Sequence, residues 1–190
     1  MAKREVSLVL LCEDTRHASC VRRFLVKVGY ADRKIRAVPL TQGRGSAEQA
    51  VRESFAHELA ACRRRRSMGH QAALVVVTDG DNQGVAGRLQ QLGAVAPRVP
   101  ADPVAILVPT WSIETWILHL RGESVDESQS YKQRCGRYDV GAVVDAAYQR
   151  WLRTRQSEPT ECVPSLAAAA EELARLPGIA PPAALPPALV

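Results

Sequence analysis

The sequence has little of what a membrane-spanning or a disulfide-stabilised protein needs. No apolar stretch in the 190 residues approaches the roughly 18–20 residues that cross a bilayer. The five cysteines are odd in number and none has C-x-x-C spacing, so we expect reduced cysteines instead of a disulfide framework or a zinc site. No Walker A sequence occurs, which excludes ATP hydrolysis by a P-loop. Because the N-terminus has no apolar signal segment, we expect a cytoplasmic protein without membrane association.

The composition is that of a globular protein of ordinary size. Hydrophobic residues make up 46% of the chain and charged residues 24%. The length suits a single domain. A net charge of +5 and a pI near 9.2 are compatible with a polyanionic partner but do not require one.

Short apolar runs alternate with segments of helical periodicity. Strands are predicted at 5–12, 34–40, 72–78 and 103–109, and helices at about 14–28, 46–66, 83–92, 111–120, 138–153 and 164–176. This alternation predicts an α/β fold, a three-layer sandwich with about four mainly parallel strands and helices on both faces. We divide the chain into a core of residues 1–135, a helical extension of the same domain at 136–176, and a Pro/Ala-rich tail at 177–190.

Acidic residues follow three of the four predicted strands. Glu13 follows the first strand, Asp79 and Asp81 follow the third, and Glu114 comes shortly after the fourth. In parallel sheets, ligands bind beyond the carboxyl ends of the strands, so these acids should meet at one edge if the strands are neighbours. Crowded carboxylates repel unless a cation neutralises them, and hard oxygen ligands suit Mg²⁺ or Mn²⁺.

A purely structural interpretation of the Asp79-Gly80-Asp81 segment stays open, because acids after a strand often cap the next helix. An EF-hand is excluded. Gln83 and Gln90 stand where that loop needs acidic ligands, and a strand precedes the segment instead of a helix.

Together these motifs resemble the TOPRIM domain. The segments are LVLLCED, LVVVTDGD, PTWSIETW and GRGSAEQAVRESFAHEL, and the likeness covers residues 5–135. It is similar in particular to small stand-alone TOPRIM proteins of bacterial defence loci, related to the overcoming-lysogenization-defect nucleases. One departure is Asp14, which stands where TOPRIM proteins usually have glycine and which could crowd the site or add a ligand.

The resemblance assigns roles to five residues. Glu13 would be a general acid/base or a metal ligand, Asp79 and Asp81 would be metal ligands, and Glu114 a further ligand. Lys132 would stabilise charge in the transition state, although a solvated loop lysine is the alternative.

The resemblance also implies an activity. The chain would be a nuclease that uses Mg²⁺ or Mn²⁺ to hydrolyse phosphodiester bonds in DNA or RNA. It would be the effector subunit of an anti-phage defence system that works with a separate ABC-type ATPase, and a homo-oligomer is compatible with this. The alternatives are a non-catalytic regulatory or nucleic-acid-binding subunit on the same fold, and a phosphohydrolase of a small substrate.

Basic residues offer candidate contacts to nucleic acid. The candidates are Arg22, Arg23, Arg44, Arg63, Arg64, Arg65 and Arg66. The last four end a predicted helix. Cations at this position interact favourably with the helix dipole, so their presence does not require a nucleic-acid ligand. His17 lies one helical turn after the first acidic motif, so a role in the site is kept open.

Overall fold

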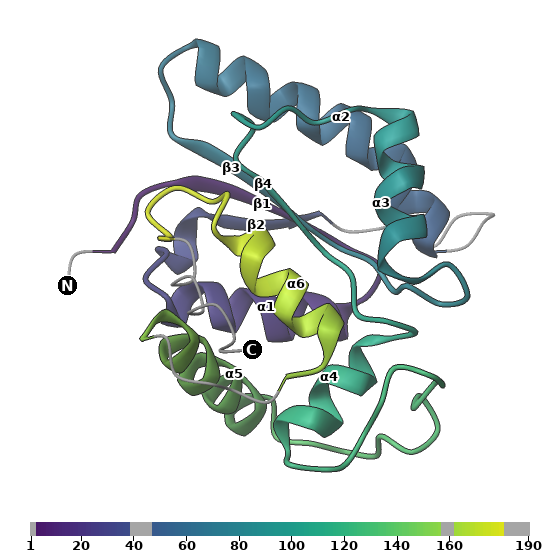
Figure 1. Cartoon of the computed structure of the whole chain (residues 1–190). Coiled ribbons are helices and arrows are strands. Elements are labelled where there is room, and N and C mark those ends of the chain that lie inside the picture. Colours follow the sequence, from purple (N-terminus) through teal and green to yellow (C-terminus); the bar gives the residue numbers. More distant parts are fainter. Residues whose placement is uncertain (1–2, 39–46, 157–161, 181–190) are drawn as a thin grey trace, which may run out of the picture.

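The strands and helices lie where the sequence predicts them. The computed structural model describes residues 3–38, 47–156 and 162–180 (Figure 1). In these residues the strands are β1 (Ser7–Cys12), β2 (Ile35–Val38), β3 (Ala72–Val77) and β4 (Val104–Leu107). The helices are α1 (Thr15–Lys27), α2 (Ala47–Ser67), α3 (Gly84–Val95), α4 (Ile113–Leu120), α5 (Val140–Arg155) and α6 (Pro164–Leu173), and a 3-10 turn, η1, spans Asp32–Lys34.

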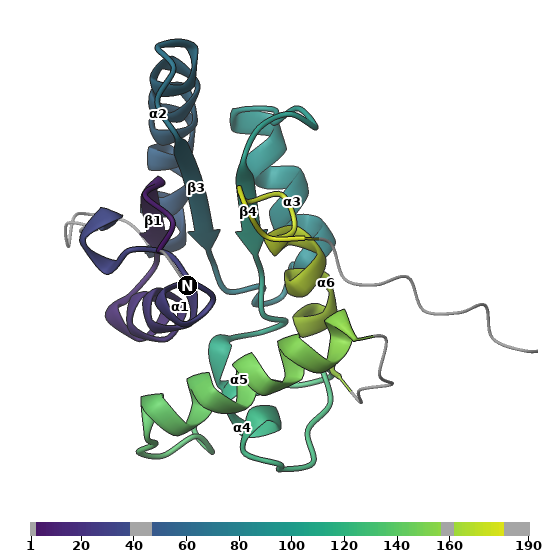
Figure 2. The ribbon, with the colours of Figure 1, turned by 90° about the vertical axis from the view of Figure 1, so that its left-hand side faces the viewer.

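The four strands form one parallel sheet in the order β2-β1-β3-β4. Leu10 stands opposite Ala37 on one side and Val75 on the other, and Val76 pairs with Ile106. The predicted α/β class with a parallel sheet is therefore confirmed. Since all strands run the same way, their carboxyl ends share one edge of the sheet, as the arrows of β3 and β4 show in Figure 2.

Both faces of the sheet are buried, which explains why its strands are continuous apolar runs. Leu8 and Leu10 point into one cluster, which also includes residues of α1, α4, α5 and α6. Val9 and Leu11 point the other way and pack with residues of α2 and α3. The result is a three-layer sandwich, with α2 and α3 on one side of the sheet and α1 and α6 on the other (Figure 1).

Local sequence signals set the limits of α1. The Asp14 side chain accepts a hydrogen bond from the His17 backbone N–H at 2.8 Å, so Asp14 is the N-cap. After the helix, Gly29 adopts a φ of 110°, a backbone conformation that favours glycine. The capping pair expected from Ser46 and Gln49 at the start of α2 involves Ser46, which lies outside the described residues.

Helix α6 covers the open edge of the sheet at β4. The Glu172 carboxylate accepts a hydrogen bond from the Ile106 backbone N–H at 2.9 Å, and it also pairs with Arg98 at 2.7 Å. At the start of α6, Ser165 Oγ accepts a hydrogen bond from Trp116 Nε1 at 2.7 Å, which joins α6 to α4. The predicted helical extension at 136–176 thus packs on the core. Its boundaries remain a prediction from the sequence. The proposed tail is described only over residues 177–180.

All five cysteines are unpaired. In the parts of the chain that the structure describes, every helix is too short or too polar to cross a membrane.

Candidate functional site

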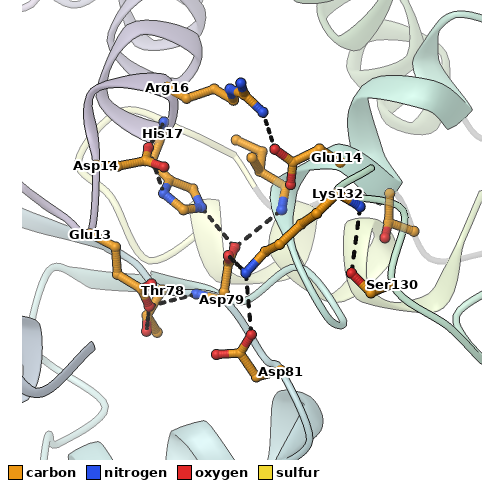
Figure 3. A network of polar contacts seen from close by, with 12 residues as sticks. Glu13, Asp14, Arg16, His17, Thr78, Asp79, Asp81, Glu114, Ser130 and Lys132 are labelled. Atoms are coloured by element: carbon orange, nitrogen blue, oxygen red, sulfur yellow. Dashed lines mark hydrogen bonds and ion pairs between the residues drawn. The ribbon is translucent and has the colours of Figure 1, made fainter. Parts of the chain in front are cut away.

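The carboxyl ends of β1 and β3 bring Glu13 and Asp79 together. Cys12 pairs with Val77 in the parallel register, so the residues that follow each strand leave the sheet side by side. Glu13 Oε1 accepts a hydrogen bond from the Asp79 backbone N–H at 2.8 Å and another from the Thr78 hydroxyl. The predicted meeting of these two segments at one edge is what the structure shows (Figure 3).

The Asp79 carboxylate is almost completely buried, with 5% of the residue exposed. Its Oδ1 lies 2.9 Å from His17 Nε2 and accepts a hydrogen bond from the Ile113 backbone N–H at 3.1 Å. Its Oδ2 lies 3.1 Å from Lys132 Nζ. Groups from α1, α4 and the loop after α4 therefore converge on this one carboxylate (Figure 3).

Asp81 shares a cation with Asp79. Lys132 Nζ lies 3.4 Å from Asp81 Oδ1, so the ammonium bridges the two aspartates. The other oxygen of Asp81 accepts a hydrogen bond from Arg88 at 3.0 Å, and Arg88 also donates to the backbone carbonyl of Asp79 at 2.8 Å. Lys132, a predicted catalytic residue from a loop, is thus placed in the site.

The backbone at Asp81 and at the facing Trp111 is strained. Asp81 and Trp111 have φ values of 44° and 64°, and they are the non-glycine residues with positive φ in the described part of the chain. They face each other, with the Asp81 N–H donating to the Trp111 carbonyl at 3.0 Å. A Cβ on Gly80 would stand 2.9 Å from the Pro109 carbonyl oxygen, so this position needs glycine. Strain of this kind gathers at functional sites.

Glu114, at the start of α4, lies at the same edge of the sheet and pairs with a cation of its own. It is buried and contacts the Arg16 guanidinium, which also lies over the Tyr138 ring at 5.7 Å. Within the described residues, no three His, Cys, Asp or Glu side chains are arranged so that they could hold one metal ion. Four acids sharing one ion are therefore not seen. Each acid instead has a cation or backbone N–H groups of the protein as its partner.

The polar network shifts several pKa values. Burial disfavours the charged form of His17, but hydrogen bonds and charges from Asp14 and Asp79 outweigh it and raise the pKa to about 10. Burial raises the pKa of Asp14 less than His17 lowers it, and the result is about 2. Burial also raises the pKa of Glu13, with help from the nearby Asp79 charge. For Lys132, the aspartates outweigh burial and raise the pKa. At neutral pH His17 is an imidazolium beside a carboxylate.

Asp79 and Asp81 suit a divalent cation as a two-carboxylate site. Mg²⁺ is usually bound by one or two carboxylates together with waters and substrate phosphates. Both carboxylates already converge on one positive atom, Lys132 Nζ, which serves as a stand-in for such an ion. The lysine side chain is 51% exposed and rises from the loop after α4.

The basic candidates are not gathered at this edge. Arg63 donates to Asp102 at 2.6 and 3.0 Å, and Arg22 donates to Asp32 at 2.7 Å. Arg63–Arg66 close α2, just before β3 begins, and therefore lie at the opposite end of the sheet from Asp79 (Figure 2). Arg23 is exposed on α1, and Arg44 lies outside the described residues.

Two cations of the site, Arg16 and Arg88, are not among the residues predicted from the sequence. Arg16 binds Glu114, and the buried Arg88 binds Asp81. Arg88 stands seven residues after Asp81, on the second turn of the helix that follows the motif. From this spacing its contact with Asp81 could have been predicted. No sequence signal pairs Arg16 with Glu114, which are 98 residues apart.

The comparisons with known proteins found no relative of this chain. The chain matches no protein-family model, no curated protein and no solved structure at a significant level.

Proposed function

We propose that this protein is a metal-dependent nuclease of the TOPRIM-like type, acting on DNA or RNA. One observation carries the proposal. Asp79 and Asp81 direct their oxygens at one cation position, beside Glu13, at the carboxyl edge of a parallel sheet. Strained backbone at the same place adds support, because a fold keeps such strain where function requires it.

The proposed roles follow from the contacts. Asp79 and Asp81 would hold the ion, with Asp79 oriented by His17 and by the Ile113 N–H. A bound Mg²⁺ or Mn²⁺ would supply positive charge to the oxygens of a phosphodiester. Glu13, whose pKa is raised by burial, is suited to hold or release a proton at its free oxygen. Lys132 would present its ammonium to a phosphate oxygen when it leaves the aspartates.

The wider role is part of the same proposal. The protein would act as the effector of an anti-phage defence system with a separate ABC-type ATPase, in the cytoplasm. No P-loop occurs in the chain itself, so ATP-driven control would require such a partner.

The sharpest test is Asp81→Asn. Asn tolerates the positive φ of this position, so the backbone conformation is retained while one ligand charge is lost. We expect metal-dependent cleavage of plasmid and single-stranded DNA and of RNA by the wild type to fall by at least about 100-fold in the variant, by analogy with the loss of one group that stabilises a transition state. The assay should be run with and without the candidate ATPase. Equal cleavage by the variant and the wild type, after removal of contaminating nuclease, would refute the proposal.

A second candidate function has its own observation. His17, Lys132, Arg88 and Arg16 pair with Asp79, Asp81 and Glu114, so three of the four acids have a cation of the protein as their partner. This favours a non-catalytic binding or regulatory subunit. Titration with Mn²⁺ separates the two functions, because the nuclease must bind the ion and lose that binding in Asp81→Asn, whereas the non-catalytic subunit shows no such site.

A further inference from the structure

A large apolar cavity lies away from the acidic site, between α1, α4, α5, α6 and β4. Its volume is about 620 Å³. Pockets that hold small molecules have volumes of about 300–1,000 Å³ and are lined mainly by apolar side chains. The walls follow this pattern, with Phe24, Trp116, Ile117, Val143, Trp151 and Leu166 among the lining residues.

One polar group in the wall has no partner. Arg150 lines the cavity from α5, and its Nη1 is buried and donates to no acceptor among the residues that the structure describes. A buried donor that is left unsatisfied destabilises a fold, so an acceptor at this position would be favoured. No other arginine or lysine is found among the described lining residues, and the acid there, Glu171, is exposed. The charge also reaches Cys162, where it opposes the rise that burial causes in the thiol pKa.

We infer that this cavity binds a small amphipathic carboxylate, with an aliphatic body among the apolar side chains and its head on the Arg150 guanidinium. An anion would supply the acceptor that Nη1 lacks. A carboxylate carries the single negative charge that one guanidinium balances, whereas a phosphate ester would bring a second charge into apolar surroundings. The inference therefore names the class of fatty-acid-like monocarboxylates.

The cavity and the acidic site share structural elements. The Ile113 side chain lines the cavity, while the backbone N–H of the same residue donates to Asp79 Oδ1 at 3.1 Å. Helix α1 carries His17 at the site and, one turn later, Cys20 and Val21 in the cavity wall. A ligand in the cavity thus touches two of the elements that orient Asp79. The binding itself does not depend on the proposed nuclease activity.

Binding can be measured by tryptophan fluorescence, because Trp116 and Trp151 line the cavity. The probes are decanoate, below its micellar concentration, and decanol, which has the same body without the charge. We expect saturable binding of decanoate to the full chain. Arg150→Gln should weaken the binding of decanoate at least about tenfold and leave decanol unchanged, since a hydrogen bond to a charged group contributes about 1.5–3 kcal/mol. Arg153→Gln, on an exposed position of α5, is the matched control and should bind like the wild type.

A second variant tests the cavity itself. Ala147→Phe places a ring in the lining of α5 and should abolish binding of both probes. Its circular dichroism and cooperative melting should match those of the wild type. Three results would each overturn the inference: no binding of decanoate to the wild type, equal decanoate affinity in Arg150→Gln, or a wild-type dimer that Ala147→Phe dissociates, which would mean that a second copy covers this face.

Discussion

The imidazole of His17 and the carboxylate of Asp79 lie 2.9 Å apart, although 62 residues separate them in the chain. Both are buried, with 1% and 5% of each residue exposed. Asp14 lies on the other side of the ring, 3.0 Å from Nδ1. The buried His17 ring therefore lies between two carboxylates, and it links the start of α1 to the end of β3.

This arrangement predicts a pH-dependent stability. The pKa of His17 is about 10 in the folded protein and 6.5 in a model compound, so its stabilising effect is complete below pH 6.5 and is lost as the pH rises toward 10. The pKa of Asp14 is about 2 instead of 3.8. The contribution of Asp14 to stability is therefore complete above pH 3.8 and is lost as the pH falls toward 2. His17→Gln should therefore lower the free energy of unfolding by roughly 1–3 kcal/mol between pH 4 and 6.5.

Urea unfolding at a series of pH values measures this effect. The difference between wild type and His17→Gln should shrink above pH 6.5. His57→Gln, on an exposed position of α2, is the control and should track the wild type. A constant difference from pH 5 to pH 10 would contradict the ion pair.

Lys132→Met should strengthen the binding of Mn²⁺. In the wild type an incoming ion competes with the ammonium that bridges Asp79 and Asp81. Since the lysine is half exposed, each of its two ion pairs contributes at most about 1 kcal/mol, and the gain in affinity should be up to about 30-fold. Calorimetric titration checks this, with Lys34→Met, an exposed lysine of η1, as the control. Weaker binding in Lys132→Met would show that the lysine does not occupy the ion position.

Gly80→Ala should destabilise the fold by roughly 1–3 kcal/mol. Its Cβ would press on the Pro109 carbonyl oxygen at 2.9 Å and would force the flanking aspartates apart. Gly93→Ala is the contrast, because nothing lies within 4 Å of its Cβ and the residue is inside α3. That change should stabilise the protein by about 0.5–1 kcal/mol. Thermal melting of both variants tests the pair, and equal effects would contradict the close approach at Gly80.

Arg63→Gln should lower stability, whereas Arg66→Gln should not. Arg63 holds the buried Asp102 through two hydrogen bonds and lowers its pKa below 3.8. Losing these bonds leaves a buried carboxylate underpartnered, at a cost of about 1–3 kcal/mol above pH 3.8, and the cost should vanish as the pH falls below that value. Arg66 is exposed at the end of the same helix. Urea unfolding at pH 7 and pH 3 distinguishes the two; equal stability of both variants at pH 7 would contradict the assigned role.

The sequence was sufficient for the four strands, the six α-helices and the meeting of Glu13 with the Asp79 segment. Strand and helix periods identified these elements, because buried runs of β-branched residues and amphipathic repeats are local features. Glu13 and Asp79 were expected at one edge because the carboxyl ends of parallel strands meet there. This expectation required that the first and third strands be neighbours in the sheet. These inferences needed no knowledge of how side chains pack.

Side-chain partners across the chain could not be predicted in this way. The pairing of Glu114 with Arg16 depends on how α1 and α4 approach each other, and no spacing in the sequence encodes that. The same holds for the cavity beside Arg150. An apolar pattern shows which residues face inward, but not whether they fill the volume between them.

The contact between Glu172 and the Ile106 N–H has a consequence for self-association. An edge strand with unsatisfied N–H groups is a template on which another chain can add a strand. At β4 the carboxylate of α6 occupies one of these donors, and the helix stands over the edge. A second molecule that added a strand at β4 would therefore have to displace the Glu172 carboxylate and α6 from this edge.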